Sequence, residues 1–598
     1  MKELLKLGVY TLLGTLLLSA PFAGLGMLST HLVTEKTFWI QLIALFLSAV
    51  SLQGLWLNPS KGLCPWTYVD ILPLSLLGLI LLSYPYSIHP EPEKLLFIGQ
   101  MVVLWYLLRQ VFHEYPVLIG YFSMFFIATG LIEAIWGFRQ LQGWAYSNHS
   151  LFRLTGSFFN PGPYSGYLAI TLPVALGILL EQSKRNMPYY LSMGCIGTAI
   201  VVLPAGMSRS AWIAVVVSCA WVYALYRLDR KQAATRLRQH KRWYILGGIL
   251  LLGGSASLYT LKKDSADGRF LMWKITTKAI QKQPITGTSL GGFPAAYAET
   301  QAEYMASGKA TEQEKLVAGC PEYAFNEYLQ IGLEQGLVGL ALFIGWLGLL
   351  FYKGIKNKRY ACCGGLMSLA IFAFSSYPLQ LPEFWVVLIF LGVMSVTPDK
   401  DEIRENQAES NGHRWGKQIF FMGIAILGIG LFWMQKDHYK AYQQWNKAQM
   451  FYNNKAYEAA LEVYEPLYPL LKHKPEFLFE AAQSLSKTGQ YEKANEYLER
   501  AVLLSSDPML YYVMAKNEQC LGEYRQAEKH LLHAIDILPE RIYPYYLLMN
   551  LYTEPSYFQP AKLKMAIDSV LTKKPKVESS AIKEMKEKAR SMLNNTSI

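Results

Sequence analysis

Long apolar runs separated by short polar connections fill the first 435 residues of the chain. About thirteen of these runs are long enough to cross the roughly 30 Å of hydrocarbon in a bilayer. They lie near residues 7–28, 38–57, 67–84, 95–112, 116–136, 163–180, 189–206, 210–226, 243–260, 336–352, 361–377, 383–397 and 417–434. An α-helix satisfies its own backbone hydrogen bonds in lipid, so the pattern predicts an all-α, polytopic membrane domain over residues 1–435.

Basic residues in the connections predict how these helices are oriented. Lys and Arg gather in three connections, at residues 184–185, 227–242 and 353–359, and alternation of the spans puts all three on one side. Cytoplasmic loops concentrate Lys and Arg, so this side and the N-terminus should be cytoplasmic. The outward side then receives residues 137–162, 206–210, 261–335, 376–383 and everything after residue 435.

The chain after residue 436 has a different pattern, with Tyr, Ala, Leu, Lys and Glu at helical spacing. It also repeats: Asn454-Lys-Ala-Tyr457, Gly489-Gln-Tyr491 and Gly522-Glu-Tyr524 recur at intervals of 34 and 33 residues. This period resembles the tetratricopeptide repeat, with three clear repeats and a degenerate fourth from Arg541. We therefore expect residues 436–598 to form an outward α-solenoid, which either binds a protein partner in its concave face or serves as a spacer.

Composition supports the membrane interpretation. The 598 residues are 52% hydrophobic and only 17% charged, which is typical of membrane proteins and not of soluble enzymes. The net charge of +12 then belongs to the cytoplasmic loops, and we expect no nucleic-acid partner. Seven cysteines without paired spacing give neither a disulfide framework nor a zinc signature, and we expect no cofactor and no metal. The first apolar run should be an uncleaved helix, and the charged stretch Asp399–Lys417 a flexible linker.

The longest polar segment between two apolar runs, residues 262–336, is divided by charge. Lysines and arginines fill its first part and glutamates its second, with a glycine-rich turn at residues 284–293 between them. Glycines in such a turn allow a close backbone approach. We expect this outward loop to carry the chemistry.

Two outward turns before this loop also contain polar residues, at positions next to the hydrocarbon where a polar group costs free energy. The first, Arg153 to Tyr164, contains Asn160-Pro161 and Gly162-Pro163, which predict a rigid turn with Arg153 at the membrane surface. The second is the very short connection Ser208-Arg209-Ser210 between two apolar helices. A charge placed there is a functional candidate, although snorkelling to the interface is the simpler explanation.

Two further candidates lie inside the loop. Residues 267–284 predict an amphipathic helix whose lysines, Lys274, Lys278 and Lys282, share one face, a pattern typical of a helix lying on anionic lipid headgroups. Residues 321–336 contain Glu322, Asn326, Glu327 and Gln330, which together offer a candidate base with amide partners. Each acidic residue there could equally be a cap or part of a solvated face.

These places together resemble the O-antigen ligase family of polytopic glycosyltransferases, which includes polysaccharide polymerases and protein O-oligosaccharyltransferases. The matching motifs are Glu133-x-x-x-Gly137-x-x-Gln140, Arg153-x-x-Gly156-x-x-x-Asn160-Pro161, Ser208-Arg209, Arg269-x-x-x-Trp273, Pro284-x-x-Gly287-x-x-x-Gly291 with Phe293, and Asn326-x-Tyr-Leu329 followed by Glu334-x-Gly336. The resemblance implies a GT-C-like membrane fold and metal-independent transfer of a glycan from a polyprenyl diphosphate at the outer face of the inner membrane.

The resemblance also implies roles for individual residues. Arg209 and Arg269 match the family's two diphosphate-handling arginines, Arg153 is a possible third, and Asn326 should contact substrate. Many relatives carry a histidine base immediately before that asparagine, whereas this chain has Phe325, which accepts no proton. Glu322 or Glu327 would then act as the base, unless the good leaving group makes a base dispensable or activity is lost.

Several functions stay open at this point. The acceptor could be a glycan, a lipid or a protein, so ligase, polymerase and protein glycosyltransferase are not separated. A non-catalytic scaffold for surface-glycan assembly is the second hypothesis, and a transporter with symmetric broken helices ranks last. The expected location is a bacterial inner membrane with the repeats in the periplasm, where lipopolysaccharide and related polysaccharides are assembled.

Overall fold

The structure is a computed structural model that describes residues 2–24, 26–28, 31–57, 64–87, 91–182, 184–229, 263–398, 414–575 and 578–595. Within these ranges the regular elements are helices, with no strand. The expected span at 243–260, most of the basic connection at 227–242 and residues 399–413 of the predicted linker lie outside the described residues. The last residues of that linker, 414–417, instead begin a long helix.

The helices fall into a membrane group, a loop group and a repeat group. The membrane group comprises α1 (Lys2–Leu18), α2 (His31–Leu57), α3 (Tyr68–Ser83), α4 (Pro92–Glu114), α5 (Leu118–Leu141), α6 (Pro161–Glu181), α7 (Met187–Val202), α8 (Arg209–Asp229), α14 (Glu327–Lys356), α15 (Tyr360–Ala373), α16 (Pro382–Val396) and α18 (Arg414–Asn453). Among the described helices, eight are long and apolar enough to cross a membrane, and α7, α15 and α16 are shorter apolar helices. The chain is therefore a multi-pass membrane protein, as predicted, although the number of thirteen spans is not confirmed.

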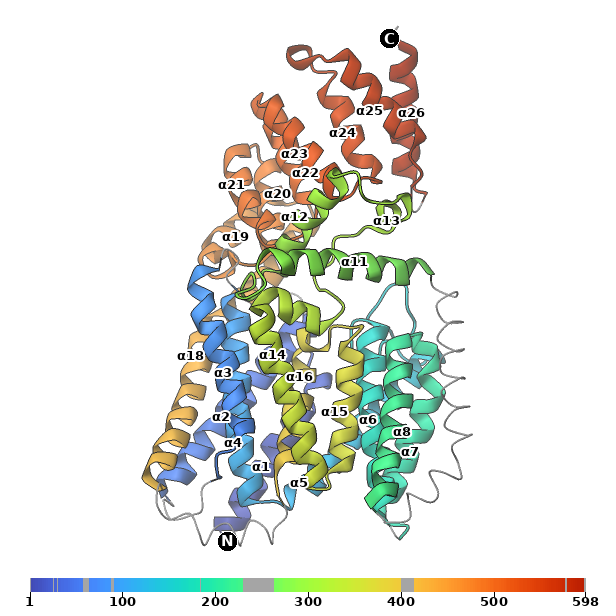
Figure 1. The fold of residues 1–598 in the computed structure, drawn as a ribbon. Helices are drawn as coiled ribbons and strands as arrows, with labels where there is room; N and C mark the ends of the chain where they lie inside the picture. Colours follow the sequence, from blue (N-terminus) through green and yellow to red (C-terminus); the bar gives the residue numbers. More distant parts are fainter. Residues whose placement is uncertain are drawn as a thin grey trace, which may run out of the picture.

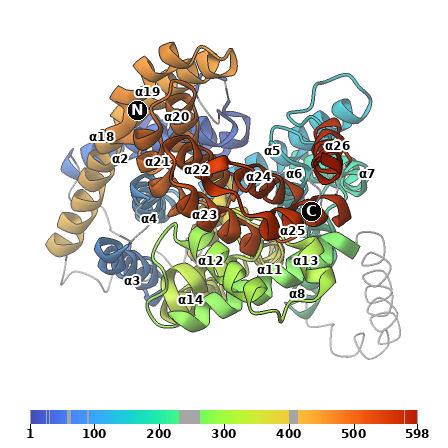
Figure 2. The ribbon, with the colours of Figure 1, turned by 90° about the horizontal axis from the view of Figure 1, so that it is seen from above.

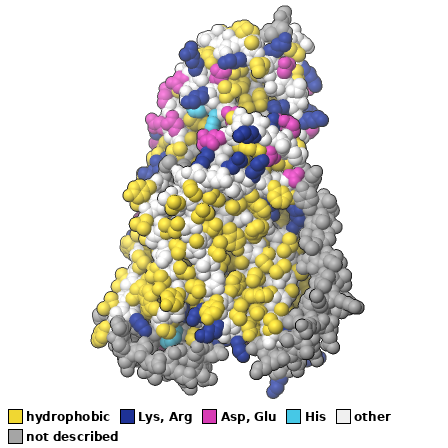
Figure 3. Space-filling model, viewed as in Figure 1, with side chains coloured by type: hydrophobic (Ala, Val, Ile, Leu, Met, Phe, Trp, Pro, Cys, Tyr) yellow, Lys and Arg dark blue, Asp and Glu magenta, His cyan; other side chains and the backbone are white. Residues whose placement is uncertain are grey.

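The connections between these helices lie at two opposite ends of the bundle. The N-terminus lies at one end and the repeats extend from the other (Figure 1). A broad band of hydrophobic side chains covers the bundle between these ends, whereas charged side chains gather over the repeats (Figure 3). This distribution matches a bilayer around the bundle and water around the repeats.

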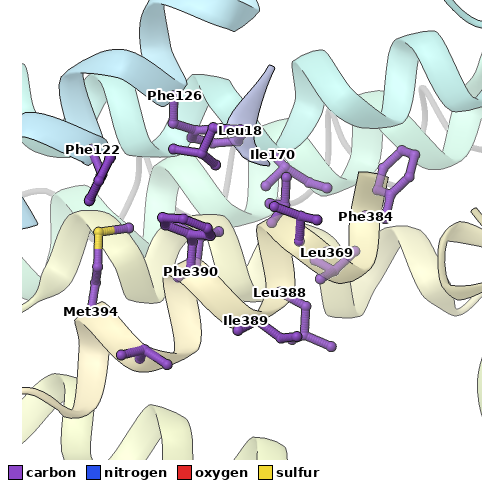
Figure 4. Close-up of a cluster of buried hydrophobic side chains, with 14 of the residues drawn as sticks. Leu18, Phe122, Phe126, Ile170, Leu369, Phe384, Leu388, Ile389, Phe390 and Met394 are labelled. Carbon is purple, nitrogen blue, oxygen red and sulfur yellow. The ribbon is translucent and has the colours of Figure 1, made fainter. Parts of the chain in front are cut away.

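Helix α16 forms the centre of the membrane group. All but one of its residues, from Pro382 to Val396, are buried, and it packs against α1, α2, α4, α14 and α15. Figure 4 shows Phe384, Phe390 and Met394 of α16 among side chains of the surrounding helices, including Phe122 and Leu369. Because protein surrounds α16 on all sides, its hydrophobic residues are a core that neighbouring helices cover.

Two buried ion pairs lie within the membrane group. Lys36 and Glu383 are each 2% exposed and their charged atoms are 3.0 Å apart, while Arg109 and Asp70 form a second pair at 3.0 Å. Lys36 also donates to the backbone oxygen of Ser157, which ties the loop ahead of α6 to the bundle. Buried charges persist only when they are paired, so these two pairs fix how their helices meet.

The repeat group continues from the membrane group without a break, because α18 runs as one helix from Arg414 to Asn453 and contains the expected boundary between residues 435 and 436. Its further helices are α19 (Tyr457–Leu471), α20 (Pro475–Lys487), α21 (Tyr491–Val502), α22 (Met509–Leu521), α23 (Tyr524–Ile537), α24 (Ile542–Leu551), α25 (Pro560–Thr572) and α26 (Ser580–Asn595). Consecutive helices pack against each other, and the small residues Ala482 and Ala515 are buried between them. The tetratricopeptide-like solenoid is confirmed.

The loop group joins the other two. Helix α11 (Lys263–Lys282) lies across the ends of the membrane helices, and α12 (Phe293–Ala306) and α13 (Glu312–Val317) lie between it and the repeats (Figures 1 and 2). Helix α12 packs against α23, where Gln301 donates to the backbone oxygen of Ile537 at 2.8 Å. Ser506 of the repeats donates to the oxygen of Pro321 at 3.0 Å. The repeats are therefore seated directly on the loop group.

The repeat turns supply a test of the solenoid. Lys455, Gly489 and Gly522 occupy equivalent turns, and their φ angles are 61°, 82° and 80°. A left-handed conformation costs a non-glycine residue about 1–2 kcal/mol. We expect Lys455→Gly to stabilise the protein by about 0.5–1 kcal/mol in thermal or denaturant unfolding, after the entropic cost of glycine is subtracted.

Lys472 supplies the matched control, because this exposed lysine ends α19 in a right-handed conformation. Lys472→Gly should destabilise the protein. Equal effects of the two glycine substitutions would contradict the strain at residue 455.

Candidate functional site

The two arginines named from the sequence lie together. Arg209 is the first residue of α8 and Arg269 lies in the second turn of α11, and both side chains are half-buried. Burial and the nearby guanidinium of Arg209 lower the pKa of Arg269. An anion bound by both guanidinium groups would offset the repulsion between them.

An aromatic cluster faces this arginine pair. The Arg269 guanidinium lies 5.6 Å from the ring centre of Phe325, which meets Tyr377 edge-on at 4.8 Å, and Tyr377 stacks on Tyr323 at 5.3 Å. Phe325 has a φ of 48°. Such a backbone is a true outlier for a bulky side chain, and strained residues of this kind concentrate at functional sites.

Glu322 lies on the other side of the aromatic cluster. Its side chain is exposed at the edge of a cavity beneath the repeats. Protein atoms around the carboxyl, together with the charges of Glu476 and Asp507 from the repeats, raise its pKa. Tyr377 contacts both Phe325 and Tyr323, and Arg269 and Glu322 act in opposite directions on the pKa of its hydroxyl.

The side chains of Glu327 and Asn326 accept hydrogen bonds from neighbouring groups of the protein. One carboxylate oxygen of Glu327 accepts the N–H of Leu379 at 2.6 Å and the other accepts Gln380 Nε2 at 2.9 Å, with the side chain 1% exposed. Asn326 caps α14, since its side-chain oxygen accepts the N–H groups of Tyr328 and Leu329. Of the two candidate bases, Glu322 therefore has the more accessible carboxylate.

Arg153 is exposed on the loop ahead of α6 and is not among the groups that shift the pKa of Arg269. The first family motif fixes this loop. Glu133 accepts from the backbone and hydroxyl of Ser157, and Gln140 Oε1 accepts the N–H groups of Thr155 and Gly156 at 2.9 and 2.7 Å. Glu133 and Gln140 thus position the loop.

The glycine-rich turn at residues 284–293 approaches the backbone of α14. The N–H of Thr288 donates to the oxygen of Leu333, and the N–H of Leu337 donates to the oxygen of Pro284, both at 2.8 Å. These bonds flank a kink at Gly336, where φ is 68° and ψ is −179°. The close approach expected from the glycines is therefore made to this helix.

Two of the three lysines on the predicted polar face of α11 pair with groups of the protein. Lys274 donates to Tyr304 at 2.6 Å and to Glu314 at 2.7 Å, and Lys282 pairs with Glu303 at 2.7 Å. The basic half of the loop thus neutralises its acidic half, which binds α11 to α12 and α13.

A cavity of about 290 Å³ opens between α2, α4, the start of α14 and the repeats. Its charged lining consists of Glu91, Glu93, Glu322, Glu334, Glu476, Lys94 and Lys474. We call it the acidic cavity, because five carboxyl groups face two lysines. Its members from α4 and the repeats were missed in the sequence, although Glu91-Pro-Glu-Lys94 stands out as a charged start to an apolar run.

A second, apolar pocket of about 110 Å³ lies beside the acidic cavity, between α3, α4, α14 and α16. The two spaces share Lys94, Gln330 and Glu334. Glu334 accepts Gln330 Nε2 at 2.7 Å and lies 3.6 Å from Lys94. This buried cluster separates a polar space from an apolar one.

Comparison with known families agrees with this arrangement. Residues 194–344 match the family model of O-Antigen ligase, and residues 453–534 match that of Anaphase-promoting complex, cyclosome, subunit 3, a tetratricopeptide-like domain. No curated protein matches the chain. The first match contains both arginines, the aromatic Phe325 and the candidate bases. The predicted resemblance, an O-antigen ligase domain followed by tetratricopeptide repeats, is confirmed.

The kink in α14 gives a test of the site's support. A Cβ on Gly336 would lie 1.9 Å from the oxygen of Ile285, and this backbone conformation is essentially restricted to glycine. We expect Gly336→Ala to cost more than about 3 kcal/mol and to lower the melting temperature or the folded yield sharply.

Gly348 in the same helix is the control, because a Cβ there would meet nothing within 4 Å. Gly348→Ala should leave the protein as stable as wild type or slightly more stable. A harmless Gly336→Ala would show that the turn and the kink are not coupled.

Proposed function

We propose that the O-antigen ligase domain of this chain transfers a glycan from a polyprenyl diphosphate to an acceptor at the outer face of the cytoplasmic membrane. The observation that carries the proposal is the convergence of Arg209 and Arg269 beside the aromatic cluster. The repeats would then lie in the periplasm, on the side opposite to the basic connections.

The arginine pair suits the leaving group. Transfer breaks the bond between the anomeric carbon of the glycan and an oxygen of the diphosphate, and the electron pair stays on that oxygen. Guanidinium groups bind phosphate oxygens through paired hydrogen bonds and stay charged at all relevant pH values. Arg209 and Arg269 would hold the diphosphate as its negative charge increases, which stabilises the transition state more than the substrate.

The acidic cavity suits the acceptor. Its carboxylates repel an anionic donor and can accept hydrogen bonds from the hydroxyl groups of a sugar, and Tyr323 supplies a ring face for stacking. In this proposal the acceptor hydroxyl attacks the anomeric carbon and its proton passes to the Glu322 carboxylate. The new glycosidic bond replaces the bond to the diphosphate, and no metal or cofactor takes part.

The repeats would help to select the acceptor, because Lys474, Glu476 and Ser505 line the same cavity. This contribution favours a large glycan or a protein as acceptor. It does not separate ligase, polymerase and protein glycosyltransferase, which share the donor chemistry. Asn326 and Glu327 would act by positioning the surrounding backbone, and the exposed Arg153 would be a third arginine for the donor.

One observation favours a second function, a non-catalytic scaffold for glycan assembly. Phe325 stands where many relatives carry a histidine base, and its ring contacts Tyr377 and Arg269. A scaffold has no requirement for paired arginines near the membrane, so the arginine variants distinguish the two functions.

The first test is glycan transfer in proteoliposomes supplied with a polyprenyl-diphosphate oligosaccharide and cell-derived acceptors. We expect Arg209→Ala and Arg269→Ala each to lower transfer by roughly a hundredfold or more, since each removes a charge that acts on the leaving group. Arg269→Lys should restore only part of the activity, because lysine lacks the planar fork.

Arg185→Ala is the control, because this exposed arginine directly precedes α7, whereas Arg209 follows the other end of that helix. It should transfer glycan like wild type. Absence of transfer by wild type with an authentic donor would favour the scaffold, as would full activity in both arginine variants.

The pH dependence of transfer tests the role of Glu322. A base must be ionised, so activity should fall as the pH drops through the raised pKa of Glu322, at a higher pH than for an ordinary glutamate. Glu476→Gln removes a like charge and should move this acidic limb to lower pH. Glu322→Gln should abolish the limb along with most activity.

An acidic limb that stays in place in Glu476→Gln would assign the titration to a different group. Undiminished transfer by Glu322→Gln would show that the reaction needs no base at this position.

A further inference from the structure

We propose that Glu93, His438 and His473 form a binding site for a zinc-class divalent cation that joins the membrane helices to the repeats. Glu93 lies in the first turn of α4, His438 in α18, and His473 between α19 and α20. The three ligand atoms all lie within 4.8 Å of one another. Their separation in sequence explains why residue spacing alone gave no sign of a metal site.

The geometry is close to that of a zinc centre. One oxygen of Glu93 lies 2.8 Å from Nδ1 of His438 and 3.2 Å from Nε2 of His473. Ligands of a tetrahedral zinc, each about 2.0–2.1 Å from the metal, are separated by about 3.3 Å. The two distances from this oxygen are close to that separation, so a cation would bind after a shift of the ligand atoms, with displacement of the protons that now bridge them.

The chemistry of the ligands indicates which cation fits. Two imidazole nitrogens and one carboxylate oxygen favour zinc and its neighbours over magnesium or calcium, which prefer oxygen alone. A fourth ligand could be water, since Glu93 and His438 line the acidic cavity.

The surroundings supply charge and outer contacts. The cavity carries five carboxyl groups against two lysines, an excess that favours a cation. The other oxygen of Glu93 accepts the hydroxyl of Tyr442 at 2.6 Å and lies 3.1 Å from Lys474. Tyr442 would hold the carboxylate in place, as outer contacts do in metal sites, whereas the Lys474 ammonium weakens binding by repulsion.

The consequence of binding is mechanical. Glu93 belongs to α4 of the membrane group, His438 to α18, which continues into the repeats, and His473 to the start of the second repeat. Lys474 and Glu476 follow His473 closely along the chain. A bound cation would therefore fix the part of the cavity wall that the repeats supply. Glycan transfer as proposed above takes no step through this cation.

The experiment titrates the full-length protein in detergent with Zn²⁺ alone, in competition with a chromophoric chelator after chelator treatment and dialysis. We expect one tight equivalent per chain, with affinity reduced at least tenfold in Glu93→Gln, His438→Ala and His473→Ala. Lys474→Gln retains all three ligands and should bind zinc more tightly than wild type. Zinc should raise the melting temperature of wild type and leave those of the ligand variants unchanged.

His530→Ala is the matched control, because His530 also pairs with a glutamate, Glu518, at 2.9 Å within the repeats. It should bind zinc like wild type. X-ray absorption at the zinc edge of the wild-type protein should show two imidazole ligands and no sulfur, a result independent of how the variants fold. The absence of a saturable equivalent, sulfur ligation, or unchanged binding in the histidine variants would each overturn the proposal.

Discussion

The backbone contact between the glycine-rich turn and the kink of α14 determines how the rest of the site is arranged. The turn at residues 284–293 continues directly from α11, which carries Arg269, and the kinked helix begins at the segment that carries Glu322 and Phe325. Two backbone hydrogen bonds hold the turn against the kink, with Gly287 and Gly336 in conformations that favour glycine. The relative position of the arginine and the aromatic cluster therefore depends on main-chain geometry, which side-chain substitutions in the loop change little.

Charge is separated on this frame. Positive groups that suit a diphosphate lie on the α8 and α11 side of the aromatic cluster, and carboxyl groups lie on the side toward α4 and the repeats. In the proposed glycosyl transfer, this separation would hold an anion on one face of the reacting carbon while a hydroxyl is deprotonated on the other. If the arginines and the carboxylates lay in one space, they would form ion pairs with each other. The aromatic cluster contacts Arg269 through Phe325 and reaches the acidic cavity through Tyr323.

The sequence predicted those parts of the molecule that depend on local pattern. Apolar runs indicated most of the membrane helices, and the 34-residue period indicated the repeats, because both signals depend only on the order of residues along the chain. The convergence of Arg209 and Arg269 was expected only through the family resemblance. The sequence could not indicate that Lys274 turns toward Glu314, because amphipathic spacing shows that a helix has a polar face without showing what covers that face. Nor could it place Glu93 beside His438 and His473, since those contacts exist only once the repeats rest on the bundle.

The repeats form part of the candidate site and are not a binding module attached by a flexible linker. Helix α18 passes from the bilayer into the first repeat without a joint, so a tilt of the repeats would have to bend this helix. Contacts at Gln301, Ser506 and Glu93 then hold the solenoid at three separate points. A body held in this way can supply a wall to a cavity with fixed geometry. Selection of an acceptor by the repeats would thus operate at the reacting centre, through Lys474 and Glu476, as well as through any partner bound at a distance.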